Sequence, residues 1–398
     1  MKQPIKKKEI KKFDIKSLKD ELGMSISTDN MVYSAAYKPQ DFIQMPNAFV
    51  EATKLPGFPV GVTSIIYGHS NTGKSLLKNC LIASAQRKGI LPVIIETENN
   101  FSFQFAIDCG MMATPVYRDV EVEAIDEETG EIKYVTENRI VNYEGDFLFY
   151  DSEMLVERYG NYDHAQGKVV SKKRTTPVIE DVAMLINDLI TLQENGKLDK
   201  SLLFIWDSIG SIPSYASLMS SKTNSMWDAK ALQDSFNIVL NNRIPSSRKI
   251  SSEYTNTFVA VNKIWLDSMS APMAAPSVKL KGGNAILYAS RLTIQLGGSI
   301  QAATKRLTAT SKGEKYCYGL VTKIKVVKNQ LDKPYGLTYE GTFCCVPDGM
   351  VSESELESYK KNNISLIMKQ LASQLNEKGK NSEITEEDIS FGEEEIDE

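Results

Sequence analysis

The sequence predicts an α/β fold in which a mainly parallel central sheet is flanked by helices. Short, continuous apolar runs alternate with helical runs along most of the chain, as expected for strands that are buried on both faces. A glycine-rich loop joins one of these strands to a helix. The chain has 398 residues, of which 42% are hydrophobic and 24% charged, which is ordinary for a globular protein with a large core.

The expected elements follow one another from residue 62 onward. The expected strands are residues 62–67, 91–95, 147–150, 202–206, 258–261, 292–296 and 320–327. The expected helices run from residue 76 to Gly89 and over 101–112, 178–192 and 227–240. Alternating residues on both sides of a turn at 126–130 predict an exposed β-hairpin. The polar stretch 152–176 is typical of a loop insertion, and 264–281 has no period.

The net charge of −5 conceals two oppositely charged ends. Residues 381–398 carry nine acids and no basic residue, so the rest of the chain has a net charge of +4. Near the N-terminus, six lysines accompany a single acid, Glu9. Such blocks are either disordered, solvated ends or parts of a polyanion-binding protein whose tail competes for its own basic surface.

Several classes of protein are disfavoured. No apolar run approaches the ~20 residues that a membrane helix needs, and the N-terminus has no secretory signal. The five cysteines lack metal-ligand spacing, and two histidines are too few for a His-based metal site. We therefore expect reduced thiols, no membrane partner and a cytoplasmic location, which is the host cytoplasm if the source is viral.

Residues 68–75 have the sequence GHSNTGKS and fit G-x-x-x-x-G-K-[ST], the phosphate-binding loop. Gly68 and Gly73 let the backbone curl so that its N–H groups point inward, and the helix N-terminus adds partial positive charge. Lys74 would reach the β- and γ-phosphates of a nucleotide, and the Ser75 hydroxyl would ligate Mg²⁺. The expected nucleotide-binding residues of this loop are Gly68, His69, Ser70, Asn71, Thr72, Gly73, Lys74 and Ser75.

Acidic residues end two of the expected strands. Asp207 follows the strand at 202–206, where an acid can hold Mg²⁺ through water beside the loop serine. Glu96 and Glu98 follow the strand at 91–95, at the edge where open α/β sheets bind ligands. A carboxylate there could orient the water that attacks a γ-phosphate, but the spacing equally suits a solvated loop acid.

Three stretches of the chain resemble the RecA-type recombinases, including the phage UvsX branch. They are residues 59–67, PVGVTSIIY, which lead into the phosphate loop, residues 281–290, KGGNAILYAS, and residues 325–329, KVVKN. Phosphate loops are common to many ATPases, whereas the second and third stretches are more specific to this family. The resemblance runs from about residue 42 to residue 347.

The resemblance implies a RecA-type phosphate-loop ATPase core with ATP and Mg²⁺ as cofactors. Asp207 matches the strand-end acid beside the metal, and Glu98, rather than Glu96, falls at the water-activating glutamate. Phe105 falls where an aromatic ring stacks on adenine. Lys328 matches one of two lysines that reach the ATP of a neighbouring subunit.

We expect the chain to divide into three parts. A basic arm for self-association occupies residues 1–41, with a short amphipathic helix around 15–22. The ATPase core occupies 42–350, with an insertion at about 113–176 that has no clear counterpart in the family. A short C-terminal segment, 351–398, ends in a disordered acidic tail.

Two DNA-binding loops are also implied, at 213–224 and 264–281. In the second loop, apolar side chains can wedge between bases and lysines can meet phosphates. Without the resemblance, a lysine-flanked, Ser- and Ala-rich segment is more often simply a mobile loop. The expected DNA-binding residues are Trp265, Met269, Met273, Lys279, Lys281, Gly282, Gly283 and Asn284.

Two positions depart from the family pattern. Lys263 stands where the family has a Gln or His that senses the γ-phosphate, so the coupling to the second loop could be stronger or differently timed. Gln330 stands at the second of the two interface lysines, and the lost cation weakens charge stabilisation across the interface. The expected catalytic residues are Glu98, Lys74, Lys263 and Lys328.

The sequence therefore predicts an ATP-dependent DNA recombinase, a DNA-dependent ATPase that forms a helical filament on single-stranded DNA. It would promote homologous pairing and strand exchange with duplex DNA, and single-strand-binding and mediator proteins are further expected partners. Two alternatives are a hexameric RecA-fold helicase or translocase, and a regulatory paralogue that binds ATP and DNA without strand exchange.

Overall fold

The structure is a computed structural model that describes nine stretches of the chain. They are residues 36–125, 132–220, 225–267, 277–280, 285–298, 304–311, 314–331, 337–369 and 389–395. The short helix that the sequence predicts around 15–22 lies outside the described residues.

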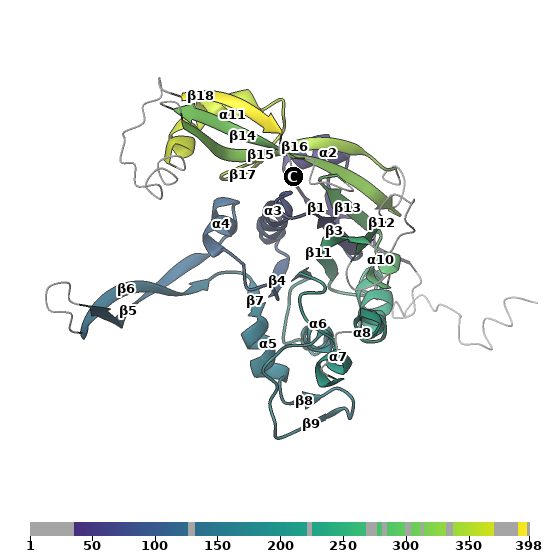
Figure 1. The fold of residues 1–398 in the computed structure, drawn as a ribbon. Helices are drawn as coiled ribbons and strands as arrows, with labels where there is room; N and C mark the ends of the chain where they lie inside the picture. Colours follow the sequence, from purple (N-terminus) through teal and green to yellow (C-terminus); the bar gives the residue numbers. More distant parts are fainter. Residues whose placement is uncertain are drawn as a thin grey trace, which may run out of the picture.

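A large sheet forms the centre of the molecule (Figure 1). In spatial order, nine of its strands are β17 (Gly349–Val351), β16 (Glu340–Val346), β15 (Glu314–Asn329), β13 (Leu292–Leu296), β3 (Thr63–Gly68), β11 (Thr257–Asp267), β10 (Leu202–Asp207), β4 (Leu91–Glu96) and β7 (Leu148–Asp151). The strands from β13 to β7 are parallel to their neighbours. β15, β16 and β17 continue the sheet in antiparallel pairs. The predicted α/β fold with a mostly parallel central sheet is confirmed.

Helices cover both faces of the parallel strands (Figure 1). One core contains side chains of α2 (Asn47–Thr53), α3 (Lys74–Arg87) and α4 (Phe103–Asp108). The other contains side chains of α5 (Ser152–Tyr159), α6 (Ile179–Glu194), α8 (Ser225–Ile238), the π-helix η2 (Val239–Arg243), α9 (Ile244–Ser246) and α10 (Ala285–Ala289). On β10, Leu203 and Ile205 enter the first core, while Phe204 and Trp206 enter the second. Burial on both faces explains why these strands are apolar throughout.

The helix predicted at 101–112 is shorter in the structure. α4 begins after Ser102, whose hydroxyl accepts a hydrogen bond from the Phe105 N–H at 3.2 Å. It ends before Gly110, whose φ of 94° lies in the left-handed region that breaks a helix. A cap at each end therefore limits this helix to six residues.

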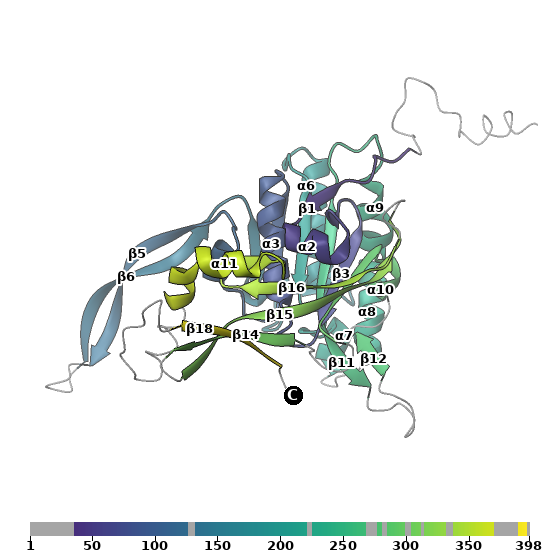
Figure 2. The ribbon, with the colours of Figure 1, turned by 90° about the horizontal axis from the view of Figure 1, so that it is seen from above.

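The predicted hairpin is confirmed and is longer than expected. β5 (Thr114–Ile125) pairs with β6 (Ile132–Glu144) in an antiparallel ribbon. The ribbon projects away from the sheet and its helices (Figures 1 and 2). Its base is fixed by aromatic packing, because Tyr143 stacks on Phe103 of α4 with ring centroids 4.3 Å apart.

The prediction that 152–176 is a loop insertion is wrong. This segment contains α5 and a small ribbon of β8 (Tyr162–Asp163) and β9 (Lys168–Val169). The Asp151 carboxylate caps α5 by accepting the Met154 N–H at 2.8 Å. The end of the segment is held by Arg174, whose guanidinium donates to both carboxylate oxygens of buried Asp181, at 2.8 and 3.0 Å. Capping and a buried ion pair therefore order a stretch whose composition is polar.

The aperiodic segment at 264–281 is partly strand. β11 continues to Asp267 and pairs with β12 (Ser277–Leu280), so that Trp265 lies opposite Lys279 in an antiparallel register. The other candidate loop, 213–224, includes the helix α7 (Tyr215–Ser220). Asp228 of α8 anchors α7 by accepting hydrogen bonds from the Ser214 and Ser217 hydroxyls, both at 2.7 Å.

A third apolar core lies where the sheet extends beyond β13. It is formed by β14 (Thr304–Ser311), β15, β16 and α11 (Leu356–Asn362). A further pair, β1 (Phe42–Gln44) and β2 (Gly57–Pro59), forms a separate two-stranded sheet. Part of the acidic tail is also a strand: β18 (Ile389–Glu395) pairs antiparallel with β14.

The prediction of a disordered tail is therefore wrong for residues 389–395. Glu394 forms an ion pair with Lys315, and Phe391 contacts the Tyr318 ring edge-on with centroids 5.6 Å apart. The acids of this strand thus meet basic residues of β14 and β15, and one aromatic ring joins the third core. Matched charges and one partly buried ring give the strand a fixed partner.

Candidate nucleotide-binding site

The phosphate loop opens into a cavity of about 1530 Å³. Ser70 to Ser75 line one side, while Glu98, Asp207 and Lys263 line another. These residues lie on or shortly after β3, β4, β10 and β11, which are parallel strands. The edge at the carboxyl ends of such strands is where open α/β sheets bind ligands.

Two glycines shape the loop. Gly73 has a φ of 83°, and a Cβ there would lie 2.7 Å from the Cys345 sulfur. At Gly68, a Cβ would lie 2.3 Å from the main-chain oxygen of Leu296. Neither position accepts a side chain without a shift of its neighbours, so both glycines are required by the loop geometry.

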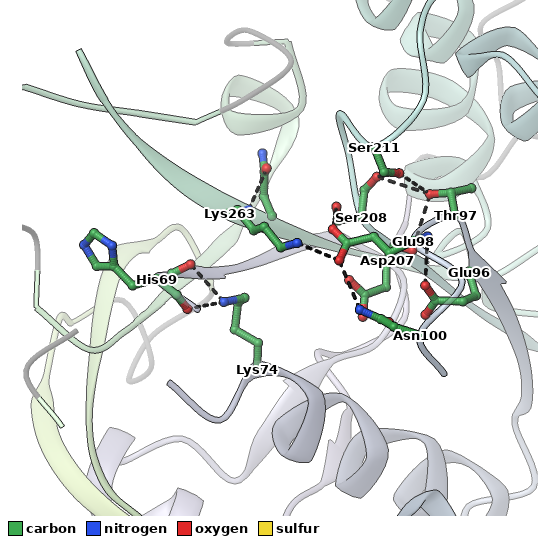
Figure 3. Close-up of polar contacts among 12 residues, drawn as sticks. His69, Lys74, Glu96, Thr97, Glu98, Asn100, Asp207, Ser208, Ser211 and Lys263 are labelled. Carbon is green, nitrogen blue, oxygen red and sulfur yellow. Dashed lines mark hydrogen bonds and ion pairs between the residues drawn. The ribbon is translucent and has the colours of Figure 1, made fainter. Parts of the chain in front are cut away.

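Lys74 lies at the start of α3, inside the loop (Figure 3). Its ammonium group donates hydrogen bonds to the main-chain oxygens of Gly68, at 2.9 Å, and of His69. Burial lowers the pKa of Lys74 to about 8. The Lys74 ammonium group is poorly solvated and bonded to neutral carbonyl oxygens. Charged phosphate oxygens would bind it more strongly and could replace those carbonyl oxygens.

Glu96 and Glu98 differ sharply in their surroundings. The Glu96 side chain is 1% exposed and faces the interior, where its Oε1 accepts the Glu98 N–H at 2.9 Å. Burial raises the pKa of Glu96. Glu98 instead lines the cavity. Only Glu98 therefore faces a bound ligand directly.

The Glu98 carboxylate is held by three neighbours (Figure 3). Lys263 donates to Oε2 at 2.7 Å, Asn100 donates to Oε2 at 3.2 Å, and the Ser208 hydroxyl donates to Oε1. Partial burial by itself raises the pKa of Glu98, but the bonds from Lys263 and Ser208 and the Lys263 charge outweigh it, so the pKa is lowered. The carboxylate is thus kept ionised, as a group that orients water needs to be.

Beneath Glu98, a buried lysine joins the two strand-end acids. The Lys78 side chain is 2% exposed; its Nζ lies 2.5 Å from Oδ2 of Asp207 and 3.4 Å from Oε2 of Glu96. It also lies 5.0 Å from the centroid of the Phe101 ring. Lys78 is one helical turn beyond Lys74 on α3, so one helix supplies both a cation for the loop and a cation for the acids.

The expected ligands of adenine and magnesium are present at this cavity. Phe105 lines it, as does Gln104 beside it. Ser75 and Asp207 also line it and offer a hydroxyl and a carboxylate, which are hard oxygen ligands of the kind that Mg²⁺ prefers. Mg²⁺ is usually held by one or two carboxylates together with substrate phosphates, so this donor set fits the ion.

Three further expected residues that the structure describes lie outside the cavity lining. Lys328 is on β15, where it donates to the main-chain oxygens of Leu287, at 2.8 Å, and Tyr288, at 3.1 Å. Trp265 and Lys279 lie in the β11–β12 ribbon. Met269, Met273, Lys281, Gly282, Gly283 and Asn284 lie outside the described residues.

Sequence reasoning missed Lys78, Ser208 and Asn100. Ser208 and Asn100 follow strand ends and carry no pattern that separates them from other loop residues. Lys78 did give a signal, because it interrupts an apolar helical run from Leu76 to Ala83. A lysine in such a run is almost never buried without a partner, so it predicts an acid nearby.

No protein-family model matches this chain, and no curated protein matches it either. Within the residues that the structure describes, no helix is both long and apolar enough to cross a membrane.

Proposed function

We propose that this chain is an ATP-dependent DNA recombinase with a RecA-type ATPase core. It would bind ATP and Mg²⁺ in the cavity of the phosphate loop and form a helical filament on single-stranded DNA. Hydrolysis would loosen that filament, and duplex DNA would be the second substrate. The five cysteines are free thiols, in keeping with the cytoplasm, of a host if the source is viral, as the proposed location.

One observation carries the ATPase part of the proposal. The phosphate loop, Glu98, Asp207 and Lys263 lie on or shortly after four parallel strands and share one cavity. Together they have the chemistry that phosphoryl transfer requires: cations for phosphate oxygens, a carboxylate ligand for the metal, and a carboxylate for the attacking water. Mg²⁺, when bound, neutralises charge that develops on the phosphates.

The recombinase part of the proposal rests on the sequence resemblance. Residues 281–290 and 325–329 distinguish the RecA-type family from other phosphate-loop ATPases. The ribbon β11–β12 supports it, because β11 links Lys263 in the cavity directly to the segment expected to touch DNA. A group that senses a nucleotide and a group that contacts DNA would then share one strand.

ATP hydrolysis in the presence of single-stranded DNA tests the site. Lys74→Ala removes the loop cation and should lower the rate at least ~100-fold. Lys88→Ala changes a half-exposed lysine just after the same helix and should leave the rate unchanged. Near-normal hydrolysis in Lys74→Ala would refute the site assignment.

Glu98→Gln and Glu96→Gln separate the two candidate bases. Glu98→Gln should bind ATP but hydrolyse it slowly, because the oxygen that orients water has lost its charge. Glu96→Gln should slow hydrolysis less, since Glu96 is buried and faces Lys78. The reverse order would mean that Glu96, not Glu98, orients the water.

Negative-stain imaging with ATP and single-stranded DNA separates the proposed function from its alternatives. A recombinase gives long helical filaments, and a hexameric helicase or translocase gives closed rings. A regulatory paralogue gives neither. Rings or dispersed particles at saturating ATP and DNA would overturn the recombinase assignment while leaving the ATPase site intact.

A further inference from the structure

The β5–β6 hairpin has one face on which apolar and acidic side chains are mixed. Side chains two residues apart on a strand share a face, and residues opposite each other in the register share it too. Tyr117 lies opposite Ile140 and Glu123 opposite Tyr134. Between these pairs lie Asp119 and Glu121. This set, together with Ile132, is called the acidic face below.

The apolar side chains of the acidic face are strongly exposed. Tyr134 is 68% exposed, Ile132 is 65% exposed and Tyr117 is 55% exposed. The hairpin stands away from the sheet and its helices in both views (Figures 1 and 2). A lone two-stranded ribbon is at best marginally stable in water, and exposed apolar rows with a polar surround mark a binding surface.

The charges of the hairpin are divided between its faces. Asp119, Glu121 and Glu123 lie on the acidic face, whereas the basic residues Arg118, Lys133 and Arg139 alternate onto the other. Over residues 114–144, nine acids stand against three basic residues in the sequence. A partner for this face must therefore be basic and must also carry apolar side chains.

The chain itself contains such a segment. Residues 2–19 carry eight lysines and two acids, with Ile5, Ile10, Phe13 and Leu18 among them. Its net charge of +6 equals in size the net charge of −6 on residues 114–144. This segment lies outside the described residues, and the first described residue is Ala36.

The position of Ala36 favours a partner in another molecule. The Ala36 oxygen accepts the Ile250 N–H at 3.0 Å, close after α9. α9 and the hairpin lie on opposite sides of the molecule (Figure 2). The described chain therefore begins on the side of the molecule far from its own hairpin, which favours the hairpin of another copy as the partner of the arm.

We propose that the acidic face of one copy binds the basic N-terminal arm, residues 2–19, of a second copy. Lysines would meet the central acids, while the isoleucine and phenylalanine side chains cover the exposed tyrosine and isoleucine rows. The described chain begins on the side opposite the hairpin, so the contact is head-to-tail, and a pair of copies retains one free arm and one free hairpin. It needs neither nucleotide nor DNA, so it stands apart from the proposed function.

Sedimentation of three proteins at low salt, without nucleotide or DNA, tests this contact. The native chain should associate as its concentration rises. Deletion of residues 2–30 removes the arm, and Asp119→Lys, Glu121→Lys and Glu123→Lys together reverse the acidic face. Each change should weaken self-association at least ~10-fold, and the effect should fade as salt screens the charges.

Mixing the two defective proteins gives the sharper result. The arm-deleted chain still has a hairpin, and the hairpin variant still has an arm, but its hairpin no longer accepts one. Only one contact can form between them, in which the arm of the hairpin variant binds the native hairpin of the arm-deleted chain. The mixture should therefore give a complex of two copies and nothing larger. Absence of that complex would overturn the proposal.

Charge reversal on both sides provides the remaining control. In the hairpin variant, Lys6→Glu, Lys7→Glu and Lys8→Glu on the arm should restore self-association, which also shows that the altered hairpin folds. A chain with Glu137→Lys, Glu153→Lys and Glu357→Lys has the same change of net charge away from the acidic face and should associate normally. Normal association in the hairpin variant, or a native chain that stays monomeric throughout, would refute the contact.

Discussion

Removing the buried cation Lys78 should destabilise the fold strongly. Lys78→Met keeps the length and apolar stem of the side chain but leaves Asp207 and Glu96 without their shared positive charge. The side chains of the three residues are only 2%, 10% and 1% exposed, in the order Lys78, Asp207, Glu96. Exposed ion pairs contribute about 0–1 kcal/mol, whereas breaking a buried pair by removing one partner costs about 3–5 kcal/mol.

Thermal unfolding measures this cost. For a chain of this size, about 2 °C of Tm corresponds to 1 kcal/mol, so Lys78→Met should lower the Tm by about 6–10 °C. The deficit should be smaller at pH 5 than at pH 8. Burial already raises the pKa of Glu96, and loss of Lys78 raises it further. A carboxyl whose folded pKa is raised contributes stability at low pH and loses it as the pH rises through that pKa.

A neutral version of the cluster separates charge from packing. Lys78→Met combined with Glu96→Gln and Asp207→Asn leaves no buried charge, so it should recover much of the lost stability even though it carries two more substitutions. Lys78→Arg retains the cation and should cost less than Lys78→Met. If Lys78→Met unfolds within 1 °C of the native chain, or the neutral version is no more stable than Lys78→Met, then the buried charges do not dominate this cluster.

Three further predictions concern the site and its surroundings. Lys263→Gln removes the main group that lowers the pKa of Glu98, so the acidic limb of the pH–rate profile of ATP hydrolysis should move to higher pH. If the limb does not move, Lys263 does not set the protonation of the catalytic group. Lys279→Ala with Lys281→Ala should weaken single-strand binding and flatten its salt dependence, because fewer counterions are released, and an unchanged slope would argue that this ribbon is not on DNA. Truncation before residue 381 removes β18 and should raise the rate at which the protein associates with duplex DNA at low salt, an effect that shrinks as salt rises. Equal rates for the full-length and truncated proteins at low salt would show that the tail does not compete with DNA.

The parts of the site that sequence predicted are those whose signals are local. The phosphate loop needs glycines because of its backbone conformation and its close contacts, as the φ of 83° at Gly73 illustrates. Strands buried on both faces must be apolar throughout, so they stand out in the sequence. Asp207 could be placed at the edge of the sheet because it directly follows such a strand.

The parts that sequence did not predict depend on partners outside the segment itself. Residue 394 meets Lys315, 79 positions earlier in the chain, so an acidic tail that is typical of disorder becomes an edge strand. Arg174 orders the polar stretch before it through Asp181, at the start of the next helix. In each case composition indicates a solvated segment, and a matched pair of charges outweighs that tendency.

The two glutamates after β4 show how local and distant rules combine. Glu96 and Glu98 are two residues apart, and spacing alone would assign them similar roles. Glu96 is the last residue of β4 and lies opposite Asp207 in the parallel register, which brings both acids to Lys78 on α3. Glu98 lies beyond the strand end, where alternation no longer applies, and turns to Lys263 and the cavity. Lys78 pairs with the two buried acids, whereas Glu98 pairs with Lys263 at the cavity, so a bound phosphate that drew Lys263 away would leave Glu98 free to act on water.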